Sequence, residues 1–142
     1  MSQASTGTTA AAGGLRVLVV DDCESMRQCV RLALARAGMT VVGEAGDGAE
    51  ALVLAAARQP DVVLMDLHMP RMDGIQATRA LRQQQPETRV VLWTGESDEP
   101  LASALSRSGA DAGLLKGVHT VELVAALRDA HARLGVPQHT AP

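Results

Sequence analysis

The sequence predicts a doubly wound α/β domain, in which helices cover both faces of a parallel sheet. Short apolar runs typical of buried strands alternate with amphipathic or Ala-rich stretches five times along the chain. Right-handed crossovers between parallel strands place the intervening helices on the two faces. With 142 residues, 46% of them hydrophobic, the chain can bury one core, and we expect no second folded output domain.

The first two strand-helix units have the clearest patterns. The β-branched run Leu15–Val20 stops abruptly at an acidic pair, as a buried strand does at its carboxyl end. Apolar residues then recur every three or four positions up to Gly38, which predicts a helix over 26–37. In the second unit, a strand at Thr40–Gly43 precedes an Ala-rich helix at Ala49–Arg58, which ends before a proline.

The next two units are separated by loops that contain proline or glycine. The third strand is expected at Val62–Met65, and the helix after it at Ile75–Gln84. The fourth strand is expected at Arg89–Thr94. A weaker helix follows, from Glu99 or Pro100 to Arg107, with a proline in its first turn and a glycine after its end.

The last unit has a short strand at Ala112–Leu115, followed by a helix. Thr120 is the expected N-cap of this helix, because its hydroxyl can accept a hydrogen bond from the first turn. The helix should face the sheet with an apolar stripe. The residues of this stripe are Val121, Val124, Leu127 and Leu134.

The segments outside these units predict the domain organisation. Residues 1–14 are mainly Ser, Thr, Ala and Gly and are expected to form a disordered leader, residues 15–134 the domain and residues 135–142 a C-terminal tail. The leader lacks the basic region and the apolar stretch of a signal peptide or membrane span, so we expect a cytoplasmic protein without membrane contact. The two cysteines are too few for a disulfide scaffold and are expected to be reduced, small apolar residues.

The charge distribution does not favour a nucleic-acid surface. The chain has a net charge of -3, and its thirteen Lys and Arg residues are scattered. Binding the phosphates of DNA or RNA requires clustered basic side chains. We therefore expect no direct nucleic-acid partner.

Polar residues follow the predicted strands and form the candidate site. Asp21 and Asp22 come after the first strand, Asp66 after the third, Thr94 ends the fourth and Lys116 follows the fifth. The carboxyl ends of parallel strands share one edge of a sheet, where such folds bind ligands. Three neighbouring carboxylates are expected to hold Mg²⁺, or alternatively Mn²⁺, and the lysine and hydroxyl can contact a phosphoryl group. Asp66 is the expected nucleophile, because it ends the central strand.

The segment Asp61–Gly74, DVVLMDLHMPRMDG, resembles the phosphoacceptor segment of response-regulator receiver domains. The resemblance covers roughly Leu15 to Leu134 and implies a flavodoxin-like (βα)5 sheet with strand order 2-1-3-4-5. It also implies that Asp66 accepts the phosphoryl group. Metal ligands would come from Asp22 directly, from Asp21 mainly through water, and from Asp66.

Further family roles are carried over onto matching positions. The backbone carbonyl of His68 would complete the metal ligands, while Thr94 and Lys116 would contact phosphoryl oxygens. The side chains of His68 and Glu96 could tune the access of hydrolytic water to the acyl phosphate. Thr94 would act in the conformational switch together with position 113, where the usual aromatic residue is replaced by Gly113.

A second departure from the family pattern is Gly117, which stands where a proline is common. We expect both departures to affect signalling geometry more than chemistry. The expected function is to accept a phosphoryl group from a sensor histidine kinase or a histidine phosphotransfer protein, and thereby change affinity for a protein target. Homodimerisation on phosphorylation is possible, and the only expected catalysis is self-phosphorylation and self-dephosphorylation.

Three alternatives remain open at this point. The chain could be the receiver half of a DNA-binding transcriptional regulator. It could be a degenerate receiver that binds partners without phosphorylation, as Gly113 and Gly117 would suggest. It could also be a phosphatase of the haloacid-dehalogenase type, but such an enzyme needs a second Asp two positions after its nucleophile, where this chain has His68.

Overall fold

The computed structural model describes residues 14–95 and 100–132. Strands and helices alternate through these residues in the predicted order. The elements are β1 (Arg16–Val20), α2 (Glu24–Arg36), β2 (Thr40–Ala45), α3 (Gly48–Arg58), β3 (Val62–Asp66), α4 (Gly74–Gln84), β4 (Arg89–Thr94), α5 (Leu101–Ser108), β5 (Ala112–Leu115) and α6 (Thr120–Ala132). The five strands are all parallel, in the order β2-β1-β3-β4-β5. The expected flavodoxin-like topology is confirmed.

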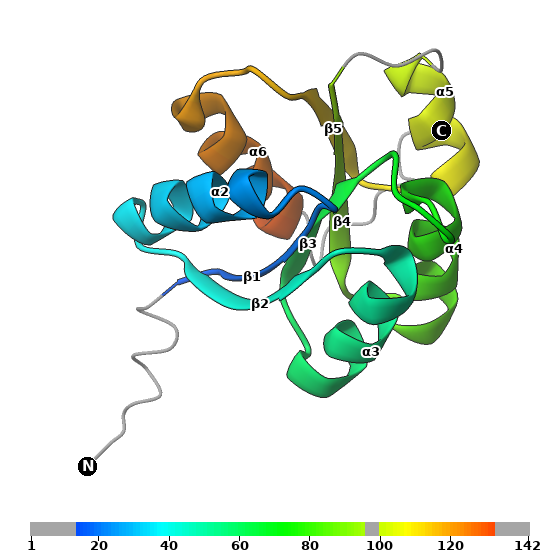
Figure 1. The fold of residues 1–142 in the computed structure, drawn as a ribbon. Helices are drawn as coiled ribbons and strands as arrows, with labels where there is room; N and C mark the ends of the chain where they lie inside the picture. The colour runs from blue at the N-terminus through cyan, green and yellow to red at the C-terminus, as the bar shows by residue number, and fades with distance from the viewer. Residues whose placement is uncertain (1–13, 96–99, 133–142) are drawn as a thin grey trace.

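Helices cover both faces of the sheet (Figure 1). Helices α2 and α6 lie on one face, and α3, α4 and α5 lie on the other. Alternate side chains of each strand point to opposite faces, so the buried residues divide into two core clusters, one on each side. All five residues of β3 are buried, which places this strand at the centre of the core. Its last residue, Asp66, lies where the carboxyl ends of the parallel strands meet.

Local capping explains where several helices begin and end. In α4, Asp73 accepts a hydrogen bond from the backbone of Gln76, and the Gln76 side chain accepts one from the Asp73 backbone. Gly38 after α2 and Gly109 after α5 have φ angles of +82° and +80°, the left-handed conformation expected of glycine at a helix end. These two endings agree with the sequence prediction.

Two predictions about the last helix are wrong. Thr120 is the first residue of α6, and the capping contacts are made by His119, whose carbonyl accepts hydrogen bonds from Glu122 and Leu123. Val121 does not face the sheet, because it is 77% exposed. Val124 and the other predicted stripe residue among those described, Leu127, are buried as expected, but they are joined by Leu123 and Ala130.

The two cysteines lie outside the hydrophobic core. Cys23 and Cys29 are both free and exposed. The predicted tail, and the leader apart from Gly14, lie outside the described residues. The helices within the described ranges are all too short or too polar to cross a membrane.

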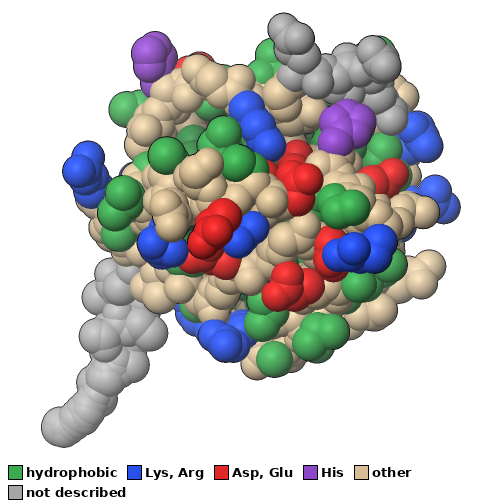
Figure 2. Space-filling model, viewed as in Figure 1, with side chains coloured by type: hydrophobic (Ala, Val, Ile, Leu, Met, Phe, Trp, Pro, Cys, Tyr) green, Lys and Arg blue, Asp and Glu red, His purple; other side chains and the backbone are tan. Residues whose placement is uncertain are grey.

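On the face shown in Figure 2, acidic and basic side chains are interspersed.

Candidate functional site

Three carboxylates meet at the carboxyl edge of the sheet. Oxygens of Asp21, Asp22 and Asp66 all lie within 4.8 Å of one another. Asp21 and Asp66 are buried, with 0% and 3% exposure, whereas Asp22 is exposed. The structure therefore brings together the three acidic residues that the strand ends predict, and gives the cluster one side chain that faces solvent.

Asp21 is held by three hydrogen bonds around the turn from β1 to α2. Its backbone N–H donates to the carbonyl of Ala45 at 3.0 Å. Its Oδ1 accepts from the backbone N–H of Cys23 at 2.9 Å, and its carbonyl accepts from Nη1 of Arg27 at 2.6 Å. These contacts fix both the backbone and the carboxylate of Asp21.

Lys116 brings a positive charge to the buried carboxylates. Its Nζ lies 2.7 Å from Oδ2 of Asp21 and 3.3 Å from Oδ1 of Asp66. The backbone N–H of Lys116 also donates to the carbonyl of Thr94 at 2.7 Å, which fixes the start of the loop after β5. One ammonium thus bridges two of the three carboxylates.

The electrostatics of the site follow from burial and from the excess of three carboxylates over one ammonium. Burial, assisted by the nearby charge of Asp21, raises the pKa of Asp66 to about 6, although Lys116 acts in the opposite direction. Burial alone would lower the pKa of Lys116, but its ion pairs with Asp21 and Asp66 outweigh that effect and raise it. The site therefore has an excess of negative charge that a divalent cation would neutralise.

The backbone around Asp66 is packed closely against the start of α4. The N–H of Gly74 donates to the carbonyl of Leu67 at 2.9 Å, and the N–H of Leu67 donates to the carbonyl of Trp93 at 3.0 Å. A Cβ atom added at Gly74 would overlap the carbonyl oxygen of Asp66 and lie 2.9 Å from Cα of Leu67. Only glycine allows the helix to approach the end of β3 this closely.

Thr94 ends β4, the strand next to β3, and His68 lies two residues after Asp66 in the loop that follows β3. The hydroxyl of Thr94 is buried and has no hydrogen-bond partner among the described residues. Leaving a buried hydroxyl without a hydrogen bond is costly, which indicates that the Thr94 hydroxyl serves to hydrogen-bond a group from outside the chain. The backbone N–H of His68 points to Oδ1 of Asp66 at 3.4 Å, and its side chain is exposed. Glu96 lies outside the described residues.

The space beside Gly113 is filled from a neighbouring helix. A Cβ at Gly113 would lie 2.8 Å from Cδ1 and 3.0 Å from Cγ of Leu101, the first residue of α5. Leu101 therefore occupies the volume into which a side chain on β5 would extend. Gly117 has a φ of +102°, so the loop after Lys116 uses a conformation that side chains rarely adopt.

Sequence reasoning missed the supporting roles of two residues. The helical pattern places Arg27 away from the apolar face of α2, but its guanidinium reaches back to the Asp21 carbonyl. The ring centroid of Trp93 lies 5.1 Å from Nζ of Lys116. Trp93 precedes Thr94 and is the only tryptophan in the chain, which could have drawn attention to it, but the contact with Lys116 depends on the pairing of β4 with β5.

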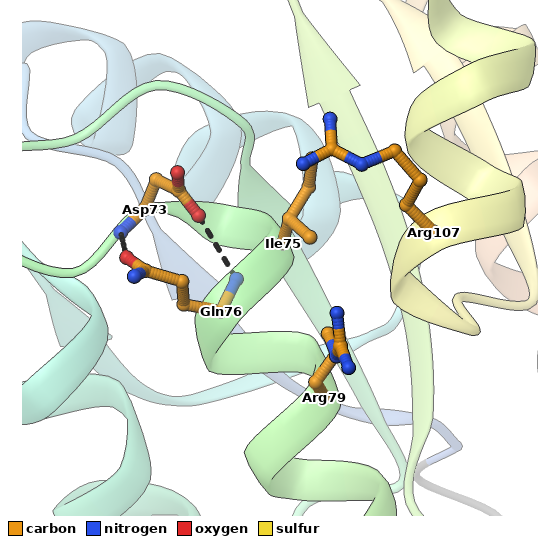
Figure 3. Close-up of a pocket in the computed structure, with 5 residues that line it drawn as sticks. All are labelled: Asp73, Ile75, Gln76, Arg79 and Arg107. Atoms are coloured by element: carbon orange, nitrogen blue, oxygen red, sulfur yellow. Dashed lines mark hydrogen bonds between the residues drawn. The ribbon is translucent and has the colours of Figure 1, made fainter.

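A separate pocket of about 470 Å³ lies between α4 and α5 (Figure 3). Its lining is polar apart from one residue. The lining residues are Asp73, Ile75, Gln76, Arg79 and Arg107. None of the three clustered carboxylates lines it, and Asp73 and Gln76 are already paired in the capping box. The pocket is therefore distinct from the acidic cluster.

Curated relatives share most of the described chain. The response regulator GacA of Pseudomonas aeruginosa is 40% identical over 119 residues, which cover 83% of this chain and 56% of that protein. An uncharacterised transcriptional regulatory protein of Bacillus subtilis, YxjL, is 39% identical over 117 residues, covering 82% of this chain and 54% of that protein. The chain thus spans about half the length of these relatives.

Solved structures agree in fold and in family. A two-component response regulator of the LuxR family from Aurantimonas has a TM-score of 0.77 and 34% identity, covering 83% of this chain and 85% of that one. The response regulator domain of Thermotoga maritima CheB has a TM-score of 0.74 and 32% identity, covering 83% of this chain and 96% of that one. The family model of the response regulator receiver domain matches residues 17–128. The chain belongs to the response regulator receiver domain family.

Proposed function

We propose that Asp66 is the phosphoacceptor of this receiver domain, and that Thr94 and Lys116 assist the transfer. The observation that carries the proposal is the buried Asp66 carboxylate beside two other carboxylates and the Lys116 ammonium. Such a group can act as a nucleophile when neighbouring charges are balanced. A histidine kinase or phosphotransfer protein would supply the phosphoryl group as a phosphohistidine.

In the proposed transfer, a carboxylate oxygen of Asp66 attacks phosphorus. A P–O bond forms, the P–N bond to the donor imidazole breaks, and its electron pair stays on the imidazole nitrogen. Lys116 would pair with a phosphoryl oxygen, since its ammonium already lies 3.3 Å from Asp66. The unpaired hydroxyl of Thr94 would donate to another phosphoryl oxygen.

The donor set fits a magnesium ion. All three side chains offer carboxylate oxygens, the ligand type that Mg²⁺ and Mn²⁺ prefer, and Asp22 is accessible from solvent. We assign Asp22, Asp66 and the backbone carbonyl of His68 as direct ligands, and Asp21 as a mainly water-mediated one. When bound, the ion would neutralise charge on the carboxylates and on phosphoryl oxygens.

Tuning and switching are assigned to neighbours of this centre. The exposed side chain of His68, two positions after Asp66, and Glu96, two positions after Thr94, would affect the access of hydrolytic water to the acyl phosphate. Thr94 would move with phosphorylation. With Gly113 on β5, the packing change would be carried by Leu101. The only catalysis in this proposal is the domain's own phosphorylation and dephosphorylation.

The relatives widen the range of partners. Two-component signalling supports a kinase or phosphotransfer protein as donor, and a protein target or a second copy of the domain as the receiver of the signal. The expectation of no nucleic-acid partner is not supported for a longer protein, because relatives of which this chain covers 54% and 55% include transcriptional regulators. The second candidate is therefore the receiver part of a transcriptional regulator. Residues 15–134 would be its receiver, and a cytoplasmic location fits both candidates.

Phosphorylation gives the direct test of Asp66. With Mg²⁺ and acetyl phosphate, the wild-type protein is expected to gain the mass of one phosphoryl group, and Asp66→Asn is expected to gain none. Asparagine is close in size to aspartate, so circular dichroism should show an unchanged fold. Intact-mass spectra with equal labelling of both proteins would contradict the assignment.

Metal binding should depend on Asp22 more than on Lys116. Asp22→Ala removes an exposed ligand without disturbing the core and is expected to weaken Mg²⁺ binding by about 10-fold or more. Lys116→Ala removes a competing cation and is expected to leave Mg²⁺ affinity unchanged or higher. Calorimetry can measure both, with Glu24→Ala, an exposed acidic residue of α2, as the control. Equal affinity in Asp22→Ala and wild type would remove Asp22 from the ligand set.

A further inference from the structure

Lys116 is the only lysine in the chain, Trp93 is the only tryptophan, and the two are in contact. The Nζ atom lies over the indole at 5.1 Å from the ring centroid. This distance is within the range of a cation–π interaction, which is stronger for tryptophan than for other side chains. The ammonium therefore has three neighbours that attract it, namely the ring and the carboxylates of Asp21 and Asp66.

The ring is itself held in a fixed position. Trp93 is 4% exposed and belongs to the core cluster on the α2 and α6 side of the sheet. Its backbone pairs with Asp66 on β3 and with Leu114 on β5, and its carbonyl accepts a hydrogen bond from Leu67. The indole N–H has no partner among the described residues, so packing and the contact with Lys116 orient the ring.

The flexible part of this arrangement is the lysine side chain. A lysine has about 2 kcal/mol of rotamer entropy and a single charge that can pair in many directions. Lys116 follows the exposed end of β5 and is adjacent to Gly117, where an added Cβ would meet no atom of the described residues within 4 Å. A rigid aromatic face beside the ammonium would restrict the positions that the side chain can adopt.

We propose that Trp93 is a positioning residue for Lys116, whose aromatic face holds the ammonium between Asp21 and Asp66 and so supports phosphoryl transfer to Asp66. The inference rests on the proposed function for its effect on phosphorylation, but the placement of the ammonium can be observed separately. The alternative is that Trp93 only fills the core. These two roles predict different behaviour for aromatic and aliphatic replacements.

The experiment compares Trp93→Phe with Trp93→Leu in the full chain. Phenylalanine keeps an aromatic face, whereas leucine keeps an apolar side chain without one. Val91→Ala is the matched control, because Val91 lies on the same strand, is fully buried in the same cluster and is removed from Lys116. All three variants lose core volume and are expected to lose some stability.

The first measurement is NMR of protein labelled only in lysine, in which every labelled side-chain signal comes from Lys116. In the wild type, the ε-methylene should show a ring-current displacement, and the Nζ–H signal should persist at low temperature because contact with water is restricted. Trp93→Leu is expected to lose both features. Trp93→Phe and Val91→Ala should retain the Nζ–H signal. The second measurement is the rate of labelling by acetyl phosphate, expected to be about two- to fivefold lower in Trp93→Leu and near wild type in the other two.

Each outcome separates the two roles. Retention of the Nζ–H signal and of the wild-type labelling rate in Trp93→Leu would overturn the proposal, and so would identical losses in Trp93→Phe and Trp93→Leu. Loss of the signal and rate in Trp93→Leu, with rescue by phenylalanine, would support it. If the wild type is not labelled at all while the NMR pattern holds, the proposed function fails and the placement of Lys116 by Trp93 stands.

Discussion

Lys116→Ala is expected to lower the free energy of unfolding near neutral pH by about 2 to 4 kcal/mol when no divalent metal is present. The substitution leaves the carboxylates of Asp21 and Asp66 buried at the same edge of the sheet without the ammonium that bridges them. Removing one partner of a buried ion pair is costly, because the remaining charge is neither hydrated nor neutralised. Urea denaturation in the presence of a chelator measures the effect.

The pH dependence of this loss follows from burial of Asp66, which raises the pKa of its carboxyl group to about 6 from an ordinary value of 3.8. Between about pH 4 and pH 6, the folded state therefore holds a proton on Asp66 that the unfolded state has released. The stability from this group is fully present below about pH 4 and is lost as the pH rises through about 6. Lys116 lowers this pKa, so in Lys116→Ala the pKa of Asp66 should be higher and the stability from its protonation should persist to a higher pH. The difference between variant and wild type should then shrink as the pH falls to about 5.

A control distinguishes this effect from the loss of any cation. Arg36 is exposed at the end of α2, so Arg36→Ala is expected to change stability by no more than about 0.5 kcal/mol. Added Mg²⁺ should restore part of the stability of Lys116→Ala. An equally small effect in both variants would show that the buried carboxylates do not depend on Lys116.

Gly74→Ala is expected to be the most disruptive single-methyl change near the site, with a loss of about 3 kcal/mol or more. The new methyl group would overlap the carbonyl oxygen of Asp66 and press on Cα of Leu67, and both are backbone atoms of a buried strand end. Relief requires α4 to move away from β3, which would also displace the Asp66 carboxylate. Thermal unfolding should show the loss, and labelling by acetyl phosphate should fall with it.

Gly95 provides the matched glycine control. It follows Thr94 at the same edge of the sheet, but a Cβ added there would meet no atom of the described residues within 4 Å. Gly95→Ala is expected to change stability by no more than about 0.5 kcal/mol. A Gly74→Ala protein as stable as Gly95→Ala would mean that the close approach of α4 to β3 is not required.

The sequence could predict the elements whose patterns depend on local rules. Val62–Met65 is apolar at every position, which is typical of a strand buried on both faces, and Asp66 marks its end. Since parallel strands end at one edge, the cluster of Asp21, Asp22 and Asp66 followed from topology before any distance was known.

Features that depend on contacts between elements could not be read in this way. The predicted stripe of α6 included Val121, but the helix buries Leu123 and Leu127, and a residue two positions before Leu123 lies about 200° around the helix from it. The sequence allowed both stripes, and packing against the sheet decides between them. Likewise, no local pattern links Trp93 to Lys116, because their contact arises from strand pairing.

The packing of Leu101 over Gly113 bears on how fast this domain can respond. Leu101 is the first residue of α5, and we expect a change of its packing to shift the backbone of this helix as well as the side chain. Rotation of one exposed side chain takes picoseconds to nanoseconds, whereas displacements of helices take about microseconds to milliseconds. Exchange between the packing of Leu101 over Gly113 and the packing proposed for the phosphorylated domain would therefore fall in the range of relaxation-dispersion NMR. The signals of α5 and β5 would then be broadened together.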